Sequence, residues 1–466
     1  MNALATLLQS RFEGRVVTAE DADYRSSAAV WNGMFEKHPA AVVRCASVTD
    51  VSIAIRVARD QGVPLSVRGG GHQISGAAVA DDALVIDLSG MRTCSYRPAT
   101  GRVVVGGGAL LGDLDRECAR NGVAVPAGMV SHTGVAGLTL GGGIGWLCRS
   151  RGLTCDSLTR VTMVDHLGEV VTASESDHPD LFWAVRGGGG NFGVVTGFEF
   201  DTAPLGLVTY GMQVHDLRDA ATVLAHLEDT REHWPRELQV LVRLQRFVGH
   251  DVEPDPRSPM VLTIEWLWDG TPAEQVRNLL PRTDRETVSV RRFTSVQAQQ
   301  DHRFGHGRRY YMKPGYLRDF GPASAASLIE AARSAPPGDA QLEILQLGGA
   351  ICDVPTEQTA FPGRDAVMAI NVQAGWEDRS DDEQLVGWAR AAHASVVPGG
   401  TGAYANFAGS DRPDLAAVFG EETLSRLREV KATYDPQDVF RPAIHIEPAA
   451  VHGAPAADSE PKGALL

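Results

Sequence analysis

Glycine-rich loops and one histidine carry most of the chemistry that this chain suggests. The first loop reads Val67-Arg68-Gly69-Gly70-Gly71-His72 and is followed by Gln73. Because three consecutive glycines leave the backbone N–H groups uncovered, such a loop can close around phosphate oxygens. His72 would then lie beside the group that carries the phosphates. The alternative interpretation is an ordinary loop histidine. It is the weaker one because two further glycine-rich loops occur in the same part of the chain.

The second and third glycine-rich loops follow within 125 residues of the first. They read Gly134-Val135-Ala136-Gly137-Leu138-Thr139-Leu140-Gly141-Gly142-Gly143-Ile144-Gly145 and Arg186-Gly187-Gly188-Gly189-Gly190-Asn191-Phe192-Gly193-Val194-Val195. Three such loops fit a long cofactor with two phosphates better than a mononucleotide. A Rossmann site needs GxGxxG between a strand and a helix with an acidic residue about 20 positions later, and this is not cleanly present. No GxxxxGK[ST] occurs, which excludes a P-loop. A two-phosphate cofactor in a non-Rossmann fold is the better prediction.

Composition narrows the class of protein. The chain has 466 residues, 43% of them hydrophobic, and a net charge of −15. This acidity argues against nucleic acid and anionic membrane surfaces as partners, since both attract basic patches. No apolar run approaches the roughly 20 residues of a membrane span, and the start of the chain does not read as a signal peptide. The six cysteines show neither metal-ligand spacing nor a CxxC pair. We expect a cytoplasmic protein without a bound metal.

The elements that must position the loops alternate between short strands and helices. The sequence predicts strands at 41–45, 65–68, 83–88 and 101–106, helices at 47–59 and 110–121, and a hairpin over 158–172. Further along it predicts strands at 210–215, 260–268, 288–293, 341–348 and 366–374, and helices at 220–233, 323–333, 382–394 and 421–433. The expected fold class is α+β.

This pattern divides the chain into four parts. Residues 1–206 are expected to form the cofactor domain, and 207–401 a substrate domain with a mostly antiparallel sheet flanked by helices. Residues 402–448 resume a compact pattern and are expected to return to the first domain. The Ala-, Pro- and Gly-rich residues 449–466 are expected to be a disordered tail.

Motifs along nearly the whole chain occur in a characteristic order. They include Trp31-Asn32, the RGGGH loop, Ser131-His132-Thr133-Gly134, the run from Phe182 to Thr196, Tyr404-Ala405-Asn406-Phe407 and Tyr434-Asp435-Pro436. Together they resemble flavin-linked oxidases of the vanillyl-alcohol-oxidase type, in the berberine-bridge-enzyme branch. The resemblance implies a PCMH-type FAD-binding domain, with the C-terminal segment reaching back over the flavin ring.

The resemblance also implies how FAD is held. The 8α-methyl group of the flavin would be joined to the imidazole of His72. Some members add a bond from a cysteine to flavin C6, but that position is Val130 here, so we expect a single covalent bond. The expected cofactor-binding residues are Val67, Arg68, Gly69, Gly70, Gly71, His72, Gln73, Ser131, His132, Gly134, Gly137, Leu138, Gly141, Gly142, Gly143, Gly145, Asn191, Gly193, Val194, Val195, Tyr404 and Asn406.

Four residues are candidates for the catalytic role. Tyr404 is the first of them, either as a base or as a positioning group, because a phenol with a pKa near 10 needs a lowered pKa to act as a base. Glu343 shares one strand face with Leu345 and is either a pocket carboxylate or a solvent-facing residue. Lys313 lies in a motif that either lines the pocket or shapes a loop. Thr133 matches a position that gates oxygen in enterocin-type relatives.

The expected reaction is a two-electron oxidation of a small-molecule alcohol, amine or secondary-metabolite intermediate. Hydride would pass to the flavin, and O₂ would reoxidise it with release of H₂O₂. One alternative is a dehydrogenase of the same fold that uses another electron acceptor. Others are an enterocin-like enzyme with a flavin N-oxide and a flavin-binding protein without turnover. The oligomeric state is left open, with a homodimer as one option.

Overall fold

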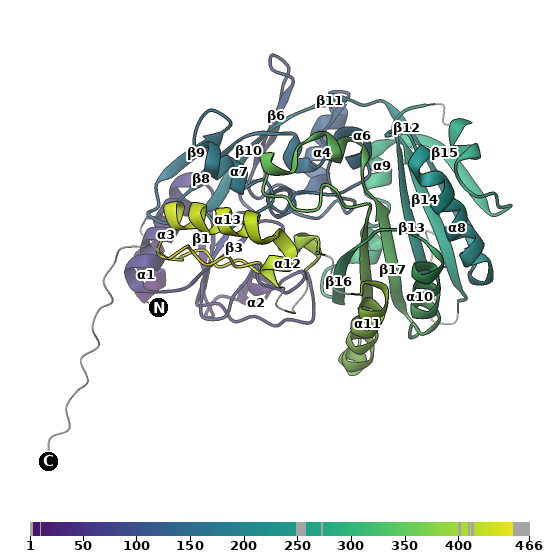
Figure 1. The fold of residues 1–466 in the computed structure, drawn as a ribbon. Coiled ribbons are helices and arrows are strands. Elements are labelled where there is room, and N and C mark those ends of the chain that lie inside the picture. The colour runs from purple at the N-terminus through teal and green to yellow at the C-terminus, as the bar shows by residue number, and fades with distance from the viewer. Residues whose placement is uncertain are drawn as a thin grey trace.

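The fold places a glycine-rich half beside a half built on one large sheet (Figure 1). The computed structural model describes residues 3–9, 11–247, 258–271, 274–398, 402–408, 411 and 414–450. Strands of three sheets and their covering helices enclose separate hydrophobic cores. The mixed α+β class expected from the sequence is confirmed.

The first sheet has the strand order β1-β2-β4-β3, in which β2, β4 and β3 are parallel. Its strands are β1 (Arg15–Val17), β2 (Ala41–Arg44), β3 (Leu65–Arg68) and β4 (Leu84–Asp87), and the nearby helices are α1 (Ala3–Gln9), α2 (Tyr24–Ala28) and α3 (Val48–Gln61). Ser47 caps α3 by accepting a hydrogen bond from the Asp50 backbone N–H. The buried face of α3 packs on this sheet, which fixes β3 and therefore the start of the first glycine loop.

The second sheet is antiparallel with the order β5-β6-β10-β8-β9. Its strands are β5 (Cys94–Arg97), β6 (Arg102–Gly106), β8 (Leu158–Val164), β9 (Val170–Ser174) and β10 (Val194–Asp201). The helices around it are α4 (Leu111–Arg120), α5 (Val135–Leu140) and α7 (Pro179–Ala184). The short helix α6 (Cys148–Arg151) packs instead against the third sheet, and β7 (Val123–Ala124) pairs with β11 (Ala203–Pro204). The second glycine loop contains and follows α5, and the third joins α7 to β10.

The third sheet has seven antiparallel strands in the order β15-β12-β14-β13-β17-β18-β16. They are β12 (Leu207–Asp216), β13 (Leu238–Arg246), β14 (Met260–Trp268), β15 (Glu286–Arg292), β16 (Arg309–Leu317), β17 (Asp339–Gln346) and β18 (Met368–Trp376). The associated helices are α8 (Ala220–Thr230), α9 (Phe293–Gln297), α10 (Pro322–Arg333) and α11 (Asp382–Val396). Figure 1 shows α8, α10 and α11 together along this sheet.

The two faces of this sheet differ in chemistry. Val242, Ile264 and Ile344 belong to the hydrophobic core that also contains the buried residues of α8, α10 and α11. Since side chains alternate along a strand, their neighbours Arg243 and Glu343 point to the opposite face. That face therefore carries buried polar groups toward the glycine-rich half.

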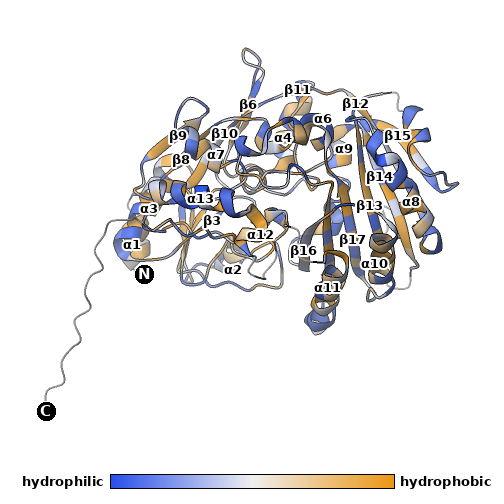
Figure 2. Ribbon diagram, viewed as in Figure 1, coloured by the Kyte–Doolittle hydropathy of each residue, from blue (hydrophilic) through white to orange (hydrophobic). Residues whose placement is uncertain are grey.

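The C-terminal segment returns to the glycine-rich half. After α11, the chain forms α12 (Leu415–Phe419) and α13 (Glu421–Tyr434). Figure 1 shows the yellow α13 among the purple and blue elements from the start of the chain. Its residues Leu424, Leu427 and Val430 are buried in the core around the second sheet. Figure 2 shows largely hydrophobic strands and a largely hydrophilic α13, so the helix uses a narrow apolar stripe. In the described part of the chain, no helix is long and apolar enough to span a bilayer.

Most expected elements occur within a few residues of their predicted bounds, but several strands were not predicted, among them β5, β10, β13 and β16. The β16 segment contains Pro314 and Gly315, which are poor strand formers. It can form a strand because it lies at the edge of the sheet. An edge strand pairs with a neighbour on one side only, so it tolerates a proline, which has no N–H group to donate. The expected tail lies outside the described residues from position 451 onward.

Candidate cofactor and substrate site

The three glycine-rich loops line one cavity. The lining also includes residues of β16, β17, β18 and the C-terminal segment, so both halves of the fold contribute. The first and second loops touch directly: a Cβ added at Gly70 would lie 2.3 Å from Gly134 N, and one at Gly134 would lie 2.4 Å from Gly70 N. These two glycines therefore allow the two loops to approach each other.

Other glycines leave free space in the cavity wall. A Cβ added at Gly137 or at Gly190 would meet no protein atom within 4 Å, and both residues line the cavity. In these two places the bare backbone faces room for a ligand. The wall thus offers uncovered peptide groups from two of the loops, which suits the phosphates of a nucleotide cofactor.

His72 sits in the cavity wall within a group of rings. Trp31 stacks on it with ring centroids 4.7 Å apart, and Tyr310 stacks on the other side of Trp31 at 4.0 Å. The Nε2 atom of His72 lies 2.6 Å from Nδ1 of His132. Burial, followed by the nearby His132 and His306, lowers the pKa of His72 well below its usual value. His72 is therefore neutral near pH 7 and can present a nitrogen lone pair.

Tyr404 and Asn406 join the C-terminal segment to the second glycine loop. The Tyr404 oxygen accepts hydrogen bonds from the backbone N–H groups of Gly143 and Ile144, both at 3.2 Å, and from Asn406 Nδ2 at 2.8 Å. Burial raises the pKa of Tyr404 to about 12, although these three donors act in the opposite direction. The phenol therefore keeps its proton near neutral pH in this structure, which favours a positioning role over a role as base.

Glu343 lies at the polar side of the cavity and is held by Arg243. Arg243 Nε donates to Glu343 Oε2 at 2.9 Å, and its Nη1 pairs with Glu265. Burial is the largest single influence and acts to lower the pKa of Arg243, but the interactions with Glu265 and Glu343 together outweigh it and raise the pKa. Two carboxylates share one guanidinium here, which leaves one negative charge in excess within the trio. The side-chain atoms Gln300 Nε2 and Asn371 Oδ1 also belong to cavity-lining residues and have no hydrogen-bond partner among the described residues.

Of the predicted site residues, most but not all line this cavity. The residues from the sequence-based set that line it are Val67, Gly69, Gly70, Gly71, His72, Gln73, Thr133, Gly134, Gly137, Leu138, Gly141, Gly193, Val194, Val195, Glu343, Tyr404 and Asn406, and Val130, the position without a cysteine, also lines it. The predicted residues outside the lining are Arg68, Ser131, His132, Gly142, Gly143, Gly145, Asn191 and Lys313.

Lys313 and Asn191 have structural partners instead. Lys313 lies in strand β16 and not in a loop. Its Nζ is 2.8 Å from Asp411 Oδ2. Asn191 donates to the backbone oxygens of Gly188 and Ile444, at 2.8 and 2.9 Å, and thereby shapes a wall that it does not line.

Several lining residues were missed by the sequence-based reasoning. The segment 440–444, including Arg441, lines the cavity although it contains no glycine motif. The fully buried Lys431 holds it by donating to Phe440 O at 2.7 Å and to Asn191 O at 2.8 Å. A lysine inside the apolar stripe of the last helix could have indicated this role, because a buried lysine needs hydrogen-bond partners. Asn371 and Gln373 were missed because strand register brings them to the site, and Gln300 was missed because it lies in the turn after α9, which approaches the cavity from a distant part of the chain.

Comparisons with known proteins agree with this geometry. Residues 39–174 match the family model of the FAD binding domain, and residues 403–446 match the model "Berberine and berberine like". An uncharacterized FAD-linked oxidoreductase of Bacillus subtilis (strain 168) is 32% identical over 449 residues, covering 93% of this chain and 96% of that protein. The (R)-6-hydroxynicotine oxidase of Paenarthrobacter nicotinovorans is 31% identical over 473 residues, covering 96% and 98%.

A solved structure shows the same fold. It is the glucooligosaccharide oxidase from Acremonium strictum, which is described with a 6-S-cysteinyl, 8α-N1-histidyl FAD. The TM-score is 0.85 at 22% identity, with 96% of this chain and all of that chain covered.

Proposed function

Since the chain belongs to the FAD-linked oxidoreductases with a berberine-like C-terminal segment, we propose that it is an oxidase carrying FAD on His72. Its substrate would be a small-molecule alcohol, amine or secondary-metabolite intermediate. Bound FAD supplies a two-electron acceptor that O₂ can regenerate with formation of H₂O₂. The observation that carries this proposal is a neutral His72 at the wall of a cavity with uncovered glycine backbone.

The residues present fit such a cofactor. Gly137 and Gly190 leave open space where a side chain would otherwise project. His72 uses Nε2 toward His132, so Nδ1 remains for a covalent bond. Nδ1 is the N1 position named for the histidyl link of the glucooligosaccharide oxidase.

We propose one covalent bond, in contrast to the two of the Acremonium enzyme. Val130 lines the cavity where the second bond would need a cysteine. Among the described residues, none of those that line the cavity is a cysteine. Cys148 is buried elsewhere, with its Sγ 3.1 Å from Gln239 Oε1.

We assign different roles in substrate binding and oxidation to the residues that line the cavity. Glu343 is the lining carboxylate, and we assign it the role of accepting the O–H or N–H proton. Tyr404 would orient the substrate through its retained phenolic proton. Gln300 and Asn371 offer one unpaired donor and one unpaired acceptor for a polar substrate. Thr133 lines the cavity and is our candidate for controlling access of O₂.

Reoxidation of the holoenzyme tests the oxidase proposal without knowledge of the substrate. The flavin would be reduced by light under anaerobic conditions and then mixed with aerated buffer in a stopped-flow instrument. We expect full reoxidation within seconds and one H₂O₂ per flavin. A reduced flavin that persists for minutes in air would favour the dehydrogenase alternative. An unusual resting spectrum, with oxygen from O₂ entering a product, would favour the flavin N-oxide alternative.

A further inference from the structure

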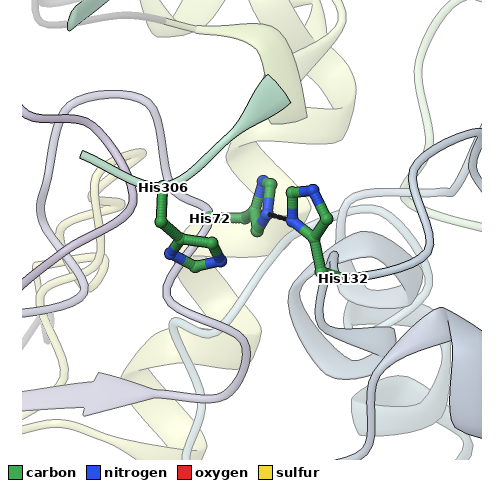
Figure 3. A group of neighbouring side chains, drawn as sticks. All are labelled: His72, His132 and His306. Carbon is green, nitrogen blue, oxygen red and sulfur yellow. Dashed lines mark hydrogen bonds between the residues drawn. The ribbon is translucent and has the colours of Figure 1, made fainter. Parts of the chain in front are cut away.

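A short hydrogen bond joins His72 to His132, which lies outside the cavity wall. Their Nε2 and Nδ1 atoms are 2.6 Å apart, and Figure 3 shows the bond as the dashed line between the two rings. The stack of Trp31 on His72 restrains the plane of the His72 ring. At this separation the two nitrogens share a single proton, so one of them donates and the other accepts.

The surroundings of His132 indicate which nitrogen donates. Its Nε2 lies 3.5 Å from the backbone oxygen of Asp301, at the long end of the hydrogen-bond range. A carbonyl oxygen can only accept, so this contact favours the His132 tautomer that carries its proton on Nε2 and leaves Nδ1 as an acceptor. His72 must then carry its own proton on Nε2 and keep the lone pair on Nδ1. Ser131 holds the loop in place, since its backbone N–H donates to Asp301 Oδ1 at 2.8 Å.

A metal site is the competing use of this cluster. His72, His132 and His306 each offer a nitrogen within 4.8 Å of the others. Two nitrogens that bind one tetrahedral zinc ion at about 2.1 Å lie about 3.4 Å apart. The 2.6 Å separation of His72 and His132 is too short for that arrangement and is typical of a hydrogen bond.

We propose that His132 prepares His72 for attachment of FAD, by holding its Nε2 tautomer and by taking the Nε2 proton as Nδ1 forms the bond. This inference rests on the proposed covalent link at His72. His132 acts through His72 and is therefore a positioning residue, with no required part in substrate oxidation.

The attachment step balances with O₂ as the oxidant. The new bond joins His72 Nδ1 to the 8α carbon and replaces one C–H bond of that methyl group. The Nε2 proton of His72 passes to His132. His132 then returns this proton to solvent. The two electrons of the broken C–H bond would be taken up by the FAD with two protons, one from the methyl group and one from solvent, and O₂ removes both as H₂O₂. Each attachment event therefore releases one H₂O₂.

The test follows attachment itself and not turnover. The full chain would be made by cell-free synthesis without FAD, and FAD would be added to start the reaction. Samples quenched with acid over time give the fraction of flavin retained in the protein pellet. For His132→Ala we expect attachment to be about a hundredfold slower, the scale of a lost general base. Added imidazole should restore part of the rate, and FAD should still bind reversibly.

His306→Gln is the matched control, because His306 belongs to the same cluster but has no hydrogen bond to His72 among the described residues. It should attach FAD at the wild-type rate. Wild-type attachment in His132→Ala would overturn the inference. Equal slowing in both variants would also overturn it and would favour a site that needs all three histidines. A wild-type protein that binds FAD but never retains it in acid would instead refute the proposed link.

Discussion

Replacing Gly137 with leucine is expected to give a folded protein that holds no FAD, bound or attached. An added Cβ at this position meets no protein atom within 4 Å, so the side chain would extend into the cavity that Gly137 lines. Gly137 lies inside α5, where a non-glycine residue is more favourable by about 0.5–1 kcal/mol. The substitution should therefore leave the melting temperature of the cofactor-free protein unchanged or higher, while the visible flavin spectrum disappears.

Gly387→Leu is the control for this change. Gly387 lies inside α11, and a Cβ there also meets no atom within 4 Å, but it is exposed and does not line the cavity. This variant should keep the full flavin content. A yellow Gly137→Leu protein with wild-type flavin content would show that FAD does not lie against α5.

Replacing Arg243 with methionine should cause the largest loss of stability. Arg243 is 1% exposed, and it neutralises two buried carboxylates, Glu265 and Glu343, whose side chains are 3% and 8% exposed. Removing the cation breaks its pairs with both carboxylates, and breaking a buried pair costs about 3–5 kcal/mol. The free energy of unfolding, measured with denaturant on the cofactor-free protein, should fall by that amount.

Two further variants serve as controls for this result. The triple variant Arg243→Met, Glu265→Gln, Glu343→Gln removes all three charges and should recover most of the lost stability. Arg56→Met breaks an exposed pair with Glu169 and should change stability by less than about 1 kcal/mol. If Arg243→Met were as mild as Arg56→Met, the buried trio would not be ionised as described.

The sequence predicted the parts of the site that depend on local pattern. The glycines of the RGGGH loop directly follow β3, as expected. His72 lies at the cavity wall beside the second loop. The period of two along β17 correctly placed Glu343 and Leu345 on one face. Both follow from residues close together in the chain.

The remainder depends on contacts between distant segments. Arg243 reaches Glu343 because β13 pairs with β17, and β13 was not predicted. Asn191 looked like a cofactor ligand because its motif is glycine-rich, yet its amide binds the backbone of Ile444. The hydrogen bond between His72 and His132 spans 60 residues, and only the approach of the first two glycine loops brings it about.

The most direct test of the account is the mass of the purified full-length protein and of its peptides. We predict the mass of the chain plus one FAD less two hydrogen atoms, with the addition on the peptide that contains His72. All six cysteines should remain open to alkylation after denaturation, and His72→Ala should carry no addition. An unmodified chain with all its FAD in the acid supernatant, or a flavin found on any other residue, would contradict the account.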